Sequence, residues 1–168
     1  MRYLSCAPSQ LLINCLGTCN HNKLCPKNGD IMEKYTHKIH YYETDRMGVT
    51  HHSNYIRIME EARVDFLDNI GWGYAKLEAM GIMSPVLGIH GQYKESTTFD
   101  DVVEVTAKVT EFKGIKFAIE YEMINIDNGH TVFTGRSEHC FLDKDMKPLR
   151  LSKEFPEFYE AMCALVEK

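Results

Sequence analysis

The stretch that decides the fold runs from Tyr41 to Arg63 and reads YYETDRMGVTHHSNYIRIMEEAR. Its first half is polar, and Gly48 allows a sharp backbone turn there. From Tyr55 to Ile70 the apolar residues recur at steps of 3, 4 and 7, which places them on one face of a helix. The pattern predicts one long helix with Ser53 or Asn54 as its N-cap.

The segments around this helix predict strands, because aromatic and apolar residues mix or alternate with polar ones. We expect one strand before the helix and four after it: Glu33 to Glu43, Val86 to Glu95, Val103 to Val109, Phe117 to Met123, and Thr131 to Leu142. Helical spacing also predicts helices at Tyr74 to Met80 and at Glu154 to Val166. Two glycines in the second strand, Gly88 and Gly91, indicate a bulge or a close backbone approach. The order of elements favours an α+β fold whose antiparallel sheet curls around the long helix.

Composition excludes several classes of protein. The chain has 168 residues, which suits one domain, and its 44% hydrophobic and 26% charged residues are typical of a globular protein. The net charge of −5 argues against nucleic-acid binding, which needs a basic face. No apolar run approaches the roughly 20 residues that span a bilayer, so we expect no membrane span.

The cysteines are unevenly distributed, with four of the six in the first 25 residues. Their spacing matches no common zinc pattern, and the main body has too few cysteines for a disulfide-stabilised extracellular domain. We expect a reducing, cytoplasmic location, with Cys140 and Cys163 as small buried hydrophobic residues.

Residues 1–31 lack any helical or strand period and are rich in Asn, Cys and Ser. We expect a disordered N-terminal extension there and a working domain at residues 32–168. A signal peptide is the alternative, but the apolar stretch from Leu11 to Ile13 is short and Asn14 interrupts it. Translation could even begin at Met32.

Two residues in the opening stretch suggest chemistry. Asp45 follows a predicted strand, and His52 lies seven residues later at the start of the long helix. The first N–H groups of a helix lack internal partners and carry partial positive charge, so they can polarise a carbonyl oxygen. A carboxylate beside them can attack that carbonyl or activate water, which suits acyl transfer or ester hydrolysis. On these arguments alone, Asp45 as a simple turn former is the equally good alternative.

The run E-T-D-x-M-G-V-x-H-H-S-N-Y-x-R-x-x-E-x-A-R, from Glu43 to Arg63, closely resembles the 4-hydroxybenzoyl-CoA thioesterase family (4HBT). It is most similar to the YbgC-like branch of bacterial acyl-CoA thioesterases. The resemblance implies a hotdog fold for residues 32–168, in which a long helix is wrapped by an antiparallel sheet. It also implies a homodimer or homotetramer with active sites at the subunit interface.

The same resemblance implies a hydrolase that splits acyl-CoA thioesters into free acid and CoA. Asp45 matches the family's catalytic acid, and His52 matches the residue whose backbone N–H faces the thioester carbonyl. No cofactor is expected, since coenzyme A is part of the substrate. Four more motif residues match positions to which we assign structural roles: Asn54, Tyr55, Glu60 and Arg63.

Several alternatives stay open at this point. A helix carboxylate, Glu60 or Glu61, could act instead of Asp45, as in another hotdog branch. The protein could also be a non-catalytic acyl-CoA-binding hotdog protein or a hotdog dehydratase, and release of free thiol separates both from a thioesterase. The carrier could be CoA or acyl carrier protein.

Other candidate residues are less specific. Cations that could bind the CoA phosphates are Lys113, Lys116, Arg136, Lys147, Arg150 and Lys153. An apolar acyl pocket could use Tyr55, Met59, Phe66, Met83 and Val86, although such residues are more often plain core. We expect no metal site: His37 and His40 should face opposite sides of a strand, and His51 and His52 should diverge.

Overall fold

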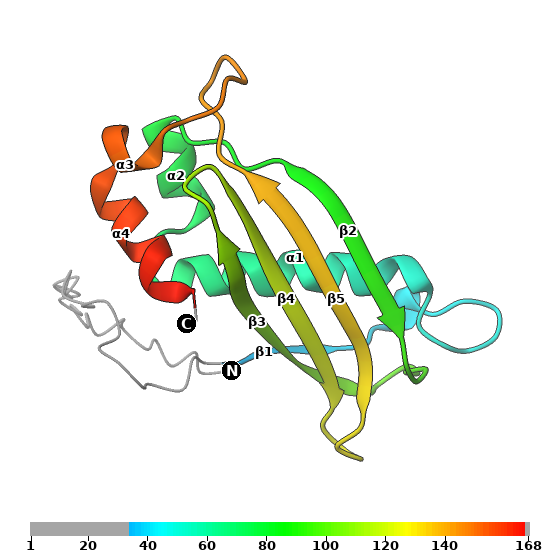
Figure 1. The fold of residues 1–168 in the computed structure, drawn as a ribbon. Coiled ribbons are helices and arrows are strands. Elements are labelled where there is room, and N and C mark those ends of the chain that lie inside the picture. The colour runs from blue at the N-terminus through cyan, green and yellow to red at the C-terminus, as the bar shows by residue number, and fades with distance from the viewer. Residues whose placement is uncertain (1–33, 167–168) are drawn as a thin grey trace, which may run out of the picture.

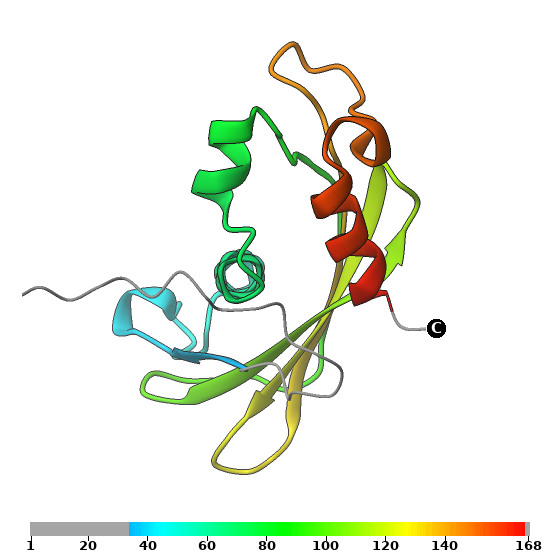
Figure 2. The same cartoon turned by 90° about the vertical axis from the view of Figure 1, so that its left-hand side faces the viewer.

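The computed structural model describes residues 34–166. One long helix, α1 (His52–Asn69), lies against a five-stranded antiparallel sheet, and the sheet curves around it (Figures 1 and 2). The strand order is β1-β3-β4-β5-β2. The strands are β1 (Tyr35–Lys38), β2 (Val86–Tyr93), β3 (Val102–Phe112), β4 (Lys116–Asn125) and β5 (Thr131–Cys140). This is the hotdog arrangement that the sequence predicted.

The core forms between the apolar face of α1 and the inner face of the sheet. Ile58, Met59 and Ala62 on α1 are almost fully buried, because their spacing puts them on one side of the helix. The sheet supplies alternate residues that point toward α1, including Val103, Val105, Ile119, Met123 and Phe133. Burial of these side chains supplies the main driving force for wrapping the sheet around the helix.

Three shorter helices complete the chain: α2 (Tyr74–Met80), α3 (Leu151–Glu154) and α4 (Pro156–Leu165). The prediction of α2 is confirmed, and it ends at Gly81 in the left-handed conformation. The helix predicted from Glu154 to Val166 is confirmed as α4, but it begins two residues later, at Pro156, whose missing N–H costs nothing at the first helical position. The short helix α3 was not predicted. Across residues 34–166, no helix is long and apolar enough to cross a membrane.

The chain before α1 differs from the prediction. The strand expected from Glu33 to Glu43 ends at Lys38 and gives way to a 3-10 helix, η1 (Tyr41–Glu43). Tyr41 and Tyr42 suggested a strand, yet their side chains are 76% and 77% exposed.

Two glycines bring the edge strand close to the core. Gly91 of β2 pairs with Gly135 of β5. A Cβ atom at Gly91 would lie 2.6 Å from Cζ of Phe133, and one at Gly135 would lie 2.9 Å from Sδ of Met59. The predicted close approach at Gly91 is confirmed, and the predicted bulge lies beside Gly88, where the pairing register shifts.

The cysteine prediction is half right. Cys140 is buried, as expected, but Cys163 is exposed on α4. The prediction for residues 1–31 lies outside the described part of the chain.

Candidate active site at the N-terminus of helix α1

A tight turn holds the side chain of Asp45. The backbone N–H of Asp45 donates to the carbonyl of Val49 (2.9 Å), and Gly48 returns a bond to the carbonyl of Asp45 (3.0 Å). The Met47 N–H donates to Oδ1 of Asp45 at 2.8 Å. Gly48 takes a φ of 78°, which a residue with a side chain adopts only with strain. The turn leaves Oδ2 of Asp45 without a hydrogen bond to any part of residues 34–166.

The helix begins immediately after this turn. Its N-cap is His51, not Ser53 or Asn54 as predicted, and the ring Nδ1 of His51 accepts the N–H of Ser53 (3.4 Å). An imidazole nitrogen thus accepts the first-turn N–H that a Ser or Asp oxygen usually accepts at a helix N-cap. His52 is the first helical residue, and its N–H has no acceptor within the described chain.

Asp45 and His52 line one cavity of about 300 Å³. The turn before α1, the first turn of α1 and the end of β2 form its wall. The other lining residues are Met47, Val49, Thr50, Tyr55, Tyr93, Lys94, Glu95 and Ser96. The structure thus brings together the two residues that the sequence singled out, a carboxylate and a helix N-terminus, at one solvent-accessible space.

Hydroxyl groups brace this cavity. Oγ1 of Thr97 is hydrogen-bonded to the hydroxyl of Tyr55 (3.0 Å) and to that of Thr50 (2.7 Å). The hydroxyl of Tyr93 donates to the carbonyl of His52 at 3.1 Å, which ties the end of β2 to the start of α1. The helix N-terminus therefore has a fixed position relative to the edge strand.

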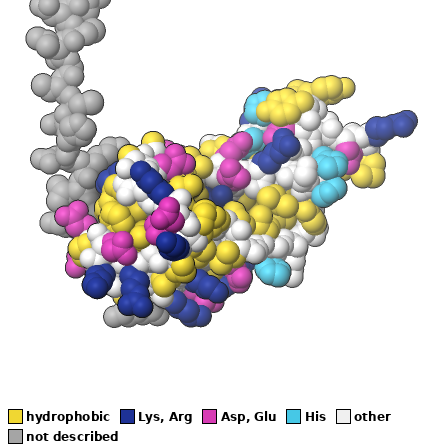
Figure 3. All heavy atoms as spheres, turned by 90° about the horizontal axis from the view of Figure 1, so that it is seen from above, with side chains coloured by type: hydrophobic (Ala, Val, Ile, Leu, Met, Phe, Trp, Pro, Cys, Tyr) yellow, Lys and Arg dark blue, Asp and Glu magenta, His cyan; other side chains and the backbone are white. Residues whose placement is uncertain are grey.

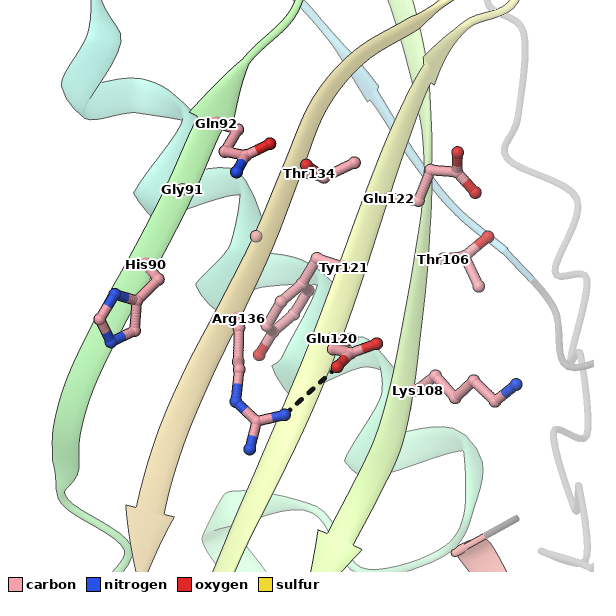
Figure 4. Close-up of a pocket in the computed structure, with 11 residues that line it drawn as sticks. His90, Gly91, Gln92, Thr106, Lys108, Glu120, Tyr121, Glu122, Thr134 and Arg136 are labelled. Atoms are coloured by element: carbon pink, nitrogen blue, oxygen red, sulfur yellow. Dashed lines mark hydrogen bonds and ion pairs between the residues drawn. The ribbon is translucent and has the colours of Figure 1, made fainter. Parts of the chain in front are cut away.

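A larger cavity, of about 620 Å³, lies on the outer face of the sheet (Figure 4). Arg136, which lines it, is paired with Glu120 of the same lining (3.2 Å) and with two carboxylates outside the lining, Glu111 (2.7 Å) and Glu138 (3.5 Å). Arg136 was a candidate for binding phosphate, but three carboxylates already surround it. Neither Asp45 nor the helix N-terminus reaches this cavity.

The structure separates most of the other predicted residues from Asp45. Glu60 and Glu61 do not line its cavity, and Glu61 instead accepts the hydroxyl of Tyr35 (2.7 Å). Of the predicted acyl-pocket residues, only Tyr55 lines the cavity; Met59 and Phe66 belong to the core, and Met83 and Val86 are exposed. None of the predicted phosphate-binding cations lines it.

Comparison with known proteins identifies the family. The family model for the thioesterase-like superfamily matches residues 39–163. The chain belongs to the thioesterase-like superfamily. It is 35% identical to a provisionally named esterase of Aquifex aeolicus, over 73% of this chain and 94% of that protein. It is 30% identical to a provisionally named acyl-CoA thioesterase of Bacillus subtilis, over 74% of this chain and 90% of that one.

A solved structure gives the same result. The DHNA-CoA thioesterase from Staphylococcus aureus superposes with a TM-score of 0.74 and 34% identity, covering 78% of this chain and 88% of that one. As a member of the thioesterase-like superfamily, the protein is a thioester hydrolase with the hotdog fold, as the motif from Glu43 to Arg63 predicted.

One positively charged residue of the candidate site, Lys94, was not predicted from the sequence. Lys94 lines the Asp45 cavity from just beyond β2, and its Nζ donates to Oε1 of Gln92 (2.7 Å). Nothing in the local pattern marks Lys94. Only the antiparallel topology, which returns the end of β2 to the start of α1, could have indicated it.

A second network of polar side chains surrounds Arg63, which is buried on α1 and also lies 3.5 Å from the hydroxyl of Tyr121. Nε of Arg63 donates to the hydroxyl of Tyr74 (2.9 Å), while the hydroxyl of Tyr121 bonds to Oγ of Ser137 (3.0 Å), which bonds to Nε2 of His139 (2.7 Å). Burial, and to a smaller extent the charge of Arg63, lowers the pKa of His139 to about 4. His139 is therefore a neutral core residue at pH 7, in keeping with the structural role expected for Arg63.

The prediction that His51 and His52 diverge is wrong, because their ring centroids lie 4.1 Å apart. The prediction that His37 and His40 face opposite ways is also wrong. The period of two holds only within a strand, and β1 ends at Lys38. Both rings turn toward the carboxylate of Glu43, at 3.0 Å from Nε2 of His37 and 3.3 Å from Nδ1 of His40. Burial raises the pKa of Glu43, but hydrogen bonds from the His40 N–H and from His37 outweigh it, so the pKa lies below its usual range.

Proposed function

We propose that the protein hydrolyses acyl-CoA thioesters to a free acid and CoA at the cavity beside α1. Asp45 acts as general base or nucleophile, and the N–H of His52 binds the thioester carbonyl oxygen. One observation carries the proposal: a carboxylate with a free oxygen and an unpaired helix N–H line the same cavity. The names of the Bacillus subtilis and Staphylococcus aureus relatives support CoA thioesters as the substrate class.

The chemistry follows from these two groups. With Asp45 as base, the carboxylate takes a proton from water and the hydroxide adds to the carbonyl carbon, so negative charge develops on the carbonyl oxygen at His52. The C–S bond then breaks, its electron pair leaves with sulfur, and the proton on Asp45 neutralises the CoA thiolate. With Asp45 as nucleophile, its carboxylate adds to the carbonyl carbon, the C–S bond breaks and CoA thiolate leaves, which gives an anhydride. Water then hydrolyses the anhydride to the free acid and restores Asp45, and the released proton neutralises the thiolate. Thiolate is a good leaving group, so neither route requires a strong general acid.

The decisive test replaces Asp45 with Asn and measures thiol release from a panel of aliphatic and aromatic acyl-CoAs. The loss of the base or nucleophile should lower kcat by about 10³-fold or more. Asp143→Asn is the matched control, because Oδ1 of Asp143 also accepts turn N–H groups, those of Asp145 and Lys147 at 2.9 Å, but lies outside the cavity.

Asp143→Asn should keep activity within about twofold of the wild type. Thiol release by a folded Asp45→Asn protein at the wild-type rate would refute the assignment. Acyl-CoA binding by the wild type without thiol release would indicate a binding protein or a dehydratase instead.

The proposal includes a homo-oligomer. Strand β2 is the last in the sheet and exposes Val86, Leu87 and Ile89 at 43%, 51% and 39%. Hydrophobic side chains also gather on the face shown in Figure 3. An exposed apolar edge strand favours pairing with a second copy of the chain. That copy would lie next to the Asp45 cavity, because Tyr93 at the end of β2 lines it. A cytoplasmic location is part of the same proposal, since Cys140 and Cys163 are free thiols.

The oligomeric state can be tested by size-exclusion chromatography with light scattering, which measures the molar mass of the eluted protein. We expect at least a dimer, and Leu87→Glu should shift it toward monomer because it places a charge at the apolar edge. Glu138→Gln, on the neighbouring strand, is the control and should leave the mass unchanged. A wild-type monomer at micromolar concentration would contradict the proposal.

A further inference from the structure

Three side chains that can bind metal converge where β1 passes into η1. Nε2 of His37, Nδ1 of His40 and a carboxylate oxygen of Glu43 all lie within 4.8 Å of one another. His37 and Glu43 are buried, at 7% and 5% exposure, and the ring of His40 is partly open to solvent. The fold has thus brought together two imidazoles and one carboxylate, and it keeps one side accessible.

The spacing of these atoms is close to that of a zinc site. Nε2 of His37 lies 3.0 Å and 3.1 Å from the two oxygens of Glu43, and Nδ1 of His40 lies 3.3 Å from one of them. In a tetrahedral site with bonds of about 2.0–2.1 Å, ligand atoms stand about 3.3 Å apart. Both histidine–Glu43 separations thus suit a zinc site, while the ring nitrogens of His37 and His40, which lie within 4.8 Å of each other, would approach by up to about 1.5 Å to bind one cation.

A second carboxylate supports His37 from behind. Nδ1 of His37 lies 3.0 Å from Oε2 of Glu61, and that oxygen also accepts the hydroxyl of Tyr35 (2.7 Å). A metal-binding histidine usually donates its other ring N–H to a carboxylate in this way, which fixes the tautomer and turns the free nitrogen toward the metal.

The charges point in the same direction. Both ring nitrogens of His37 face carboxylates, those of Glu43 and Glu61. A neutral ring can donate to only one of these carboxylates, whereas either a doubly protonated ring or a bound cation satisfies both. The carboxylates of Glu43 and Glu61 carry two negative charges, which a bound divalent cation would offset.

We propose that His37, His40 and Glu43 form a site for one divalent transition metal ion of the Zn²⁺ type. Mixed imidazole and carboxylate ligands suit zinc and its neighbours, whereas Ca²⁺ and Mg²⁺ require mostly oxygen ligands. Three protein ligands leave a fourth position for water on the open side, beside His40.

The site is separate from the Asp45 cavity but is connected to it through Glu43. None of the three ligands lines that cavity. The carbonyl oxygen of Glu43 accepts the N–H of His51 (2.8 Å) and Nδ2 of Asn54 (2.7 Å), so the residue that binds the metal also positions the first turn of α1. The metal fixes this junction, and no step of thioester hydrolysis passes through it.

Titration calorimetry of the full chain with ZnCl2 alone, after chelator dialysis, tests the site. His40→Ala removes one ligand that is partly exposed, so the fold should survive. His130→Ala is the matched control, because His130 is an exposed histidine paired with Glu95 outside the cluster. Four cysteines precede residue 34 and can bind zinc themselves, so the difference between proteins is the informative quantity.

We expect the wild type and His130→Ala to bind one zinc ion more than His40→Ala, with a Kd of about 10 µM or tighter. Zinc at hundredfold excess over Kd should raise the melting temperature of the wild type by about 5–10 °C relative to His40→Ala. Equal stoichiometry and equal thermal shifts in all three proteins would overturn the proposal and leave a purely hydrogen-bonded cluster.

Crystals of the wild type soaked in ZnCl2 give a test that needs no variant. Anomalous diffraction at the zinc edge should show a peak about 2.0–2.2 Å from all three ligand atoms. A data set with zinc bound elsewhere but no peak among His37, His40 and Glu43 would also overturn the proposal.

Discussion

Two cavities formed by residues 34–166 differ in size and in how their polar groups are satisfied. The larger, of about 620 Å³, lies on the outer face of the sheet, and the smaller, of about 300 Å³, lies at the tip of α1. In the larger one, Arg136 already has three carboxylate partners, Glu111, Glu120 and Glu138, of which Figure 4 shows Glu120. In the smaller one, Asp45 keeps a free oxygen and His52 an unpaired N–H. Unsatisfied groups, more than volume, mark where a substrate gains interactions.

The sharpest way to break this comparison is to remove the unpaired N–H itself. Proline at position 52 has no N–H, yet proline is well tolerated at the first position of a helix. His51 is already extended, with φ −63° and ψ 134°, which suits a residue before proline. We expect His52→Pro to lower kcat by about 10²–10³-fold, as measured by thiol release.

His52→Ala is the companion variant, because it removes the ring and keeps the N–H. Its kcat should stay well above that of His52→Pro, and circular dichroism should show the same helix content in both. If the two variants lose activity equally, the ring and not the backbone of His52 is the important group, and the comparison fails.

A substitution of Lys94 tests the same comparison between the two cavities, with a smaller expected effect. Its ammonium is the cation that lines the Asp45 cavity, so it should attract the phosphates of a CoA substrate. We expect Lys94→Gln to raise KM about three- to tenfold at low salt, with kcat little changed. The difference should shrink at about 0.5 M salt, where screening weakens exposed charges. A salt-independent effect would argue against an electrostatic role, and Lys108→Gln in the larger cavity is the control.

Substitutions in the larger cavity should have little effect on thioester hydrolysis. Glu120→Gln removes one of the three carboxylates around Arg136 but leaves Glu111 and Glu138 in place. We expect kcat/KM for acyl-CoA to change by less than about twofold, since surface ion pairs contribute little and Asp45 is elsewhere. A loss of tenfold or more would show that the outer face takes part in the reaction.

Much of the fold could be predicted from the sequence, because periodicity reports which face of an element is buried. The apolar steps from Tyr55 to Ile70 predicted α1, and alternation predicted the strands after it. The prediction failed where local chemistry resembled another element. Tyr41 and Tyr42 have strand propensity but lie in an exposed 3-10 turn, and His51 caps a helix although imidazole is an uncommon cap.

Some residues of the candidate site could likewise be predicted from the sequence, and others could not. Asp45 and His52 could be predicted because both lie on one short continuous stretch. Lys94 could not be, because its approach to Asp45 depends on the return of β2 across the sheet. The convergence of His37 and His40 on Glu43 was also missed, since it requires knowing that β1 ends at Lys38.

The facing glycines of β2 and β5 fix more than local packing. With Gly91 opposite Gly135, the ring of Phe133 and the sulfur of Met59 occupy the space that side chains would need. If β2 slid by one residue, a bulky side chain would enter that space and every residue of the strand would exchange faces. Tyr93 would then turn away from the carbonyl of His52. The alignment of two residues without side chains thus sets how far the outermost strand can drift from the tip of the central helix.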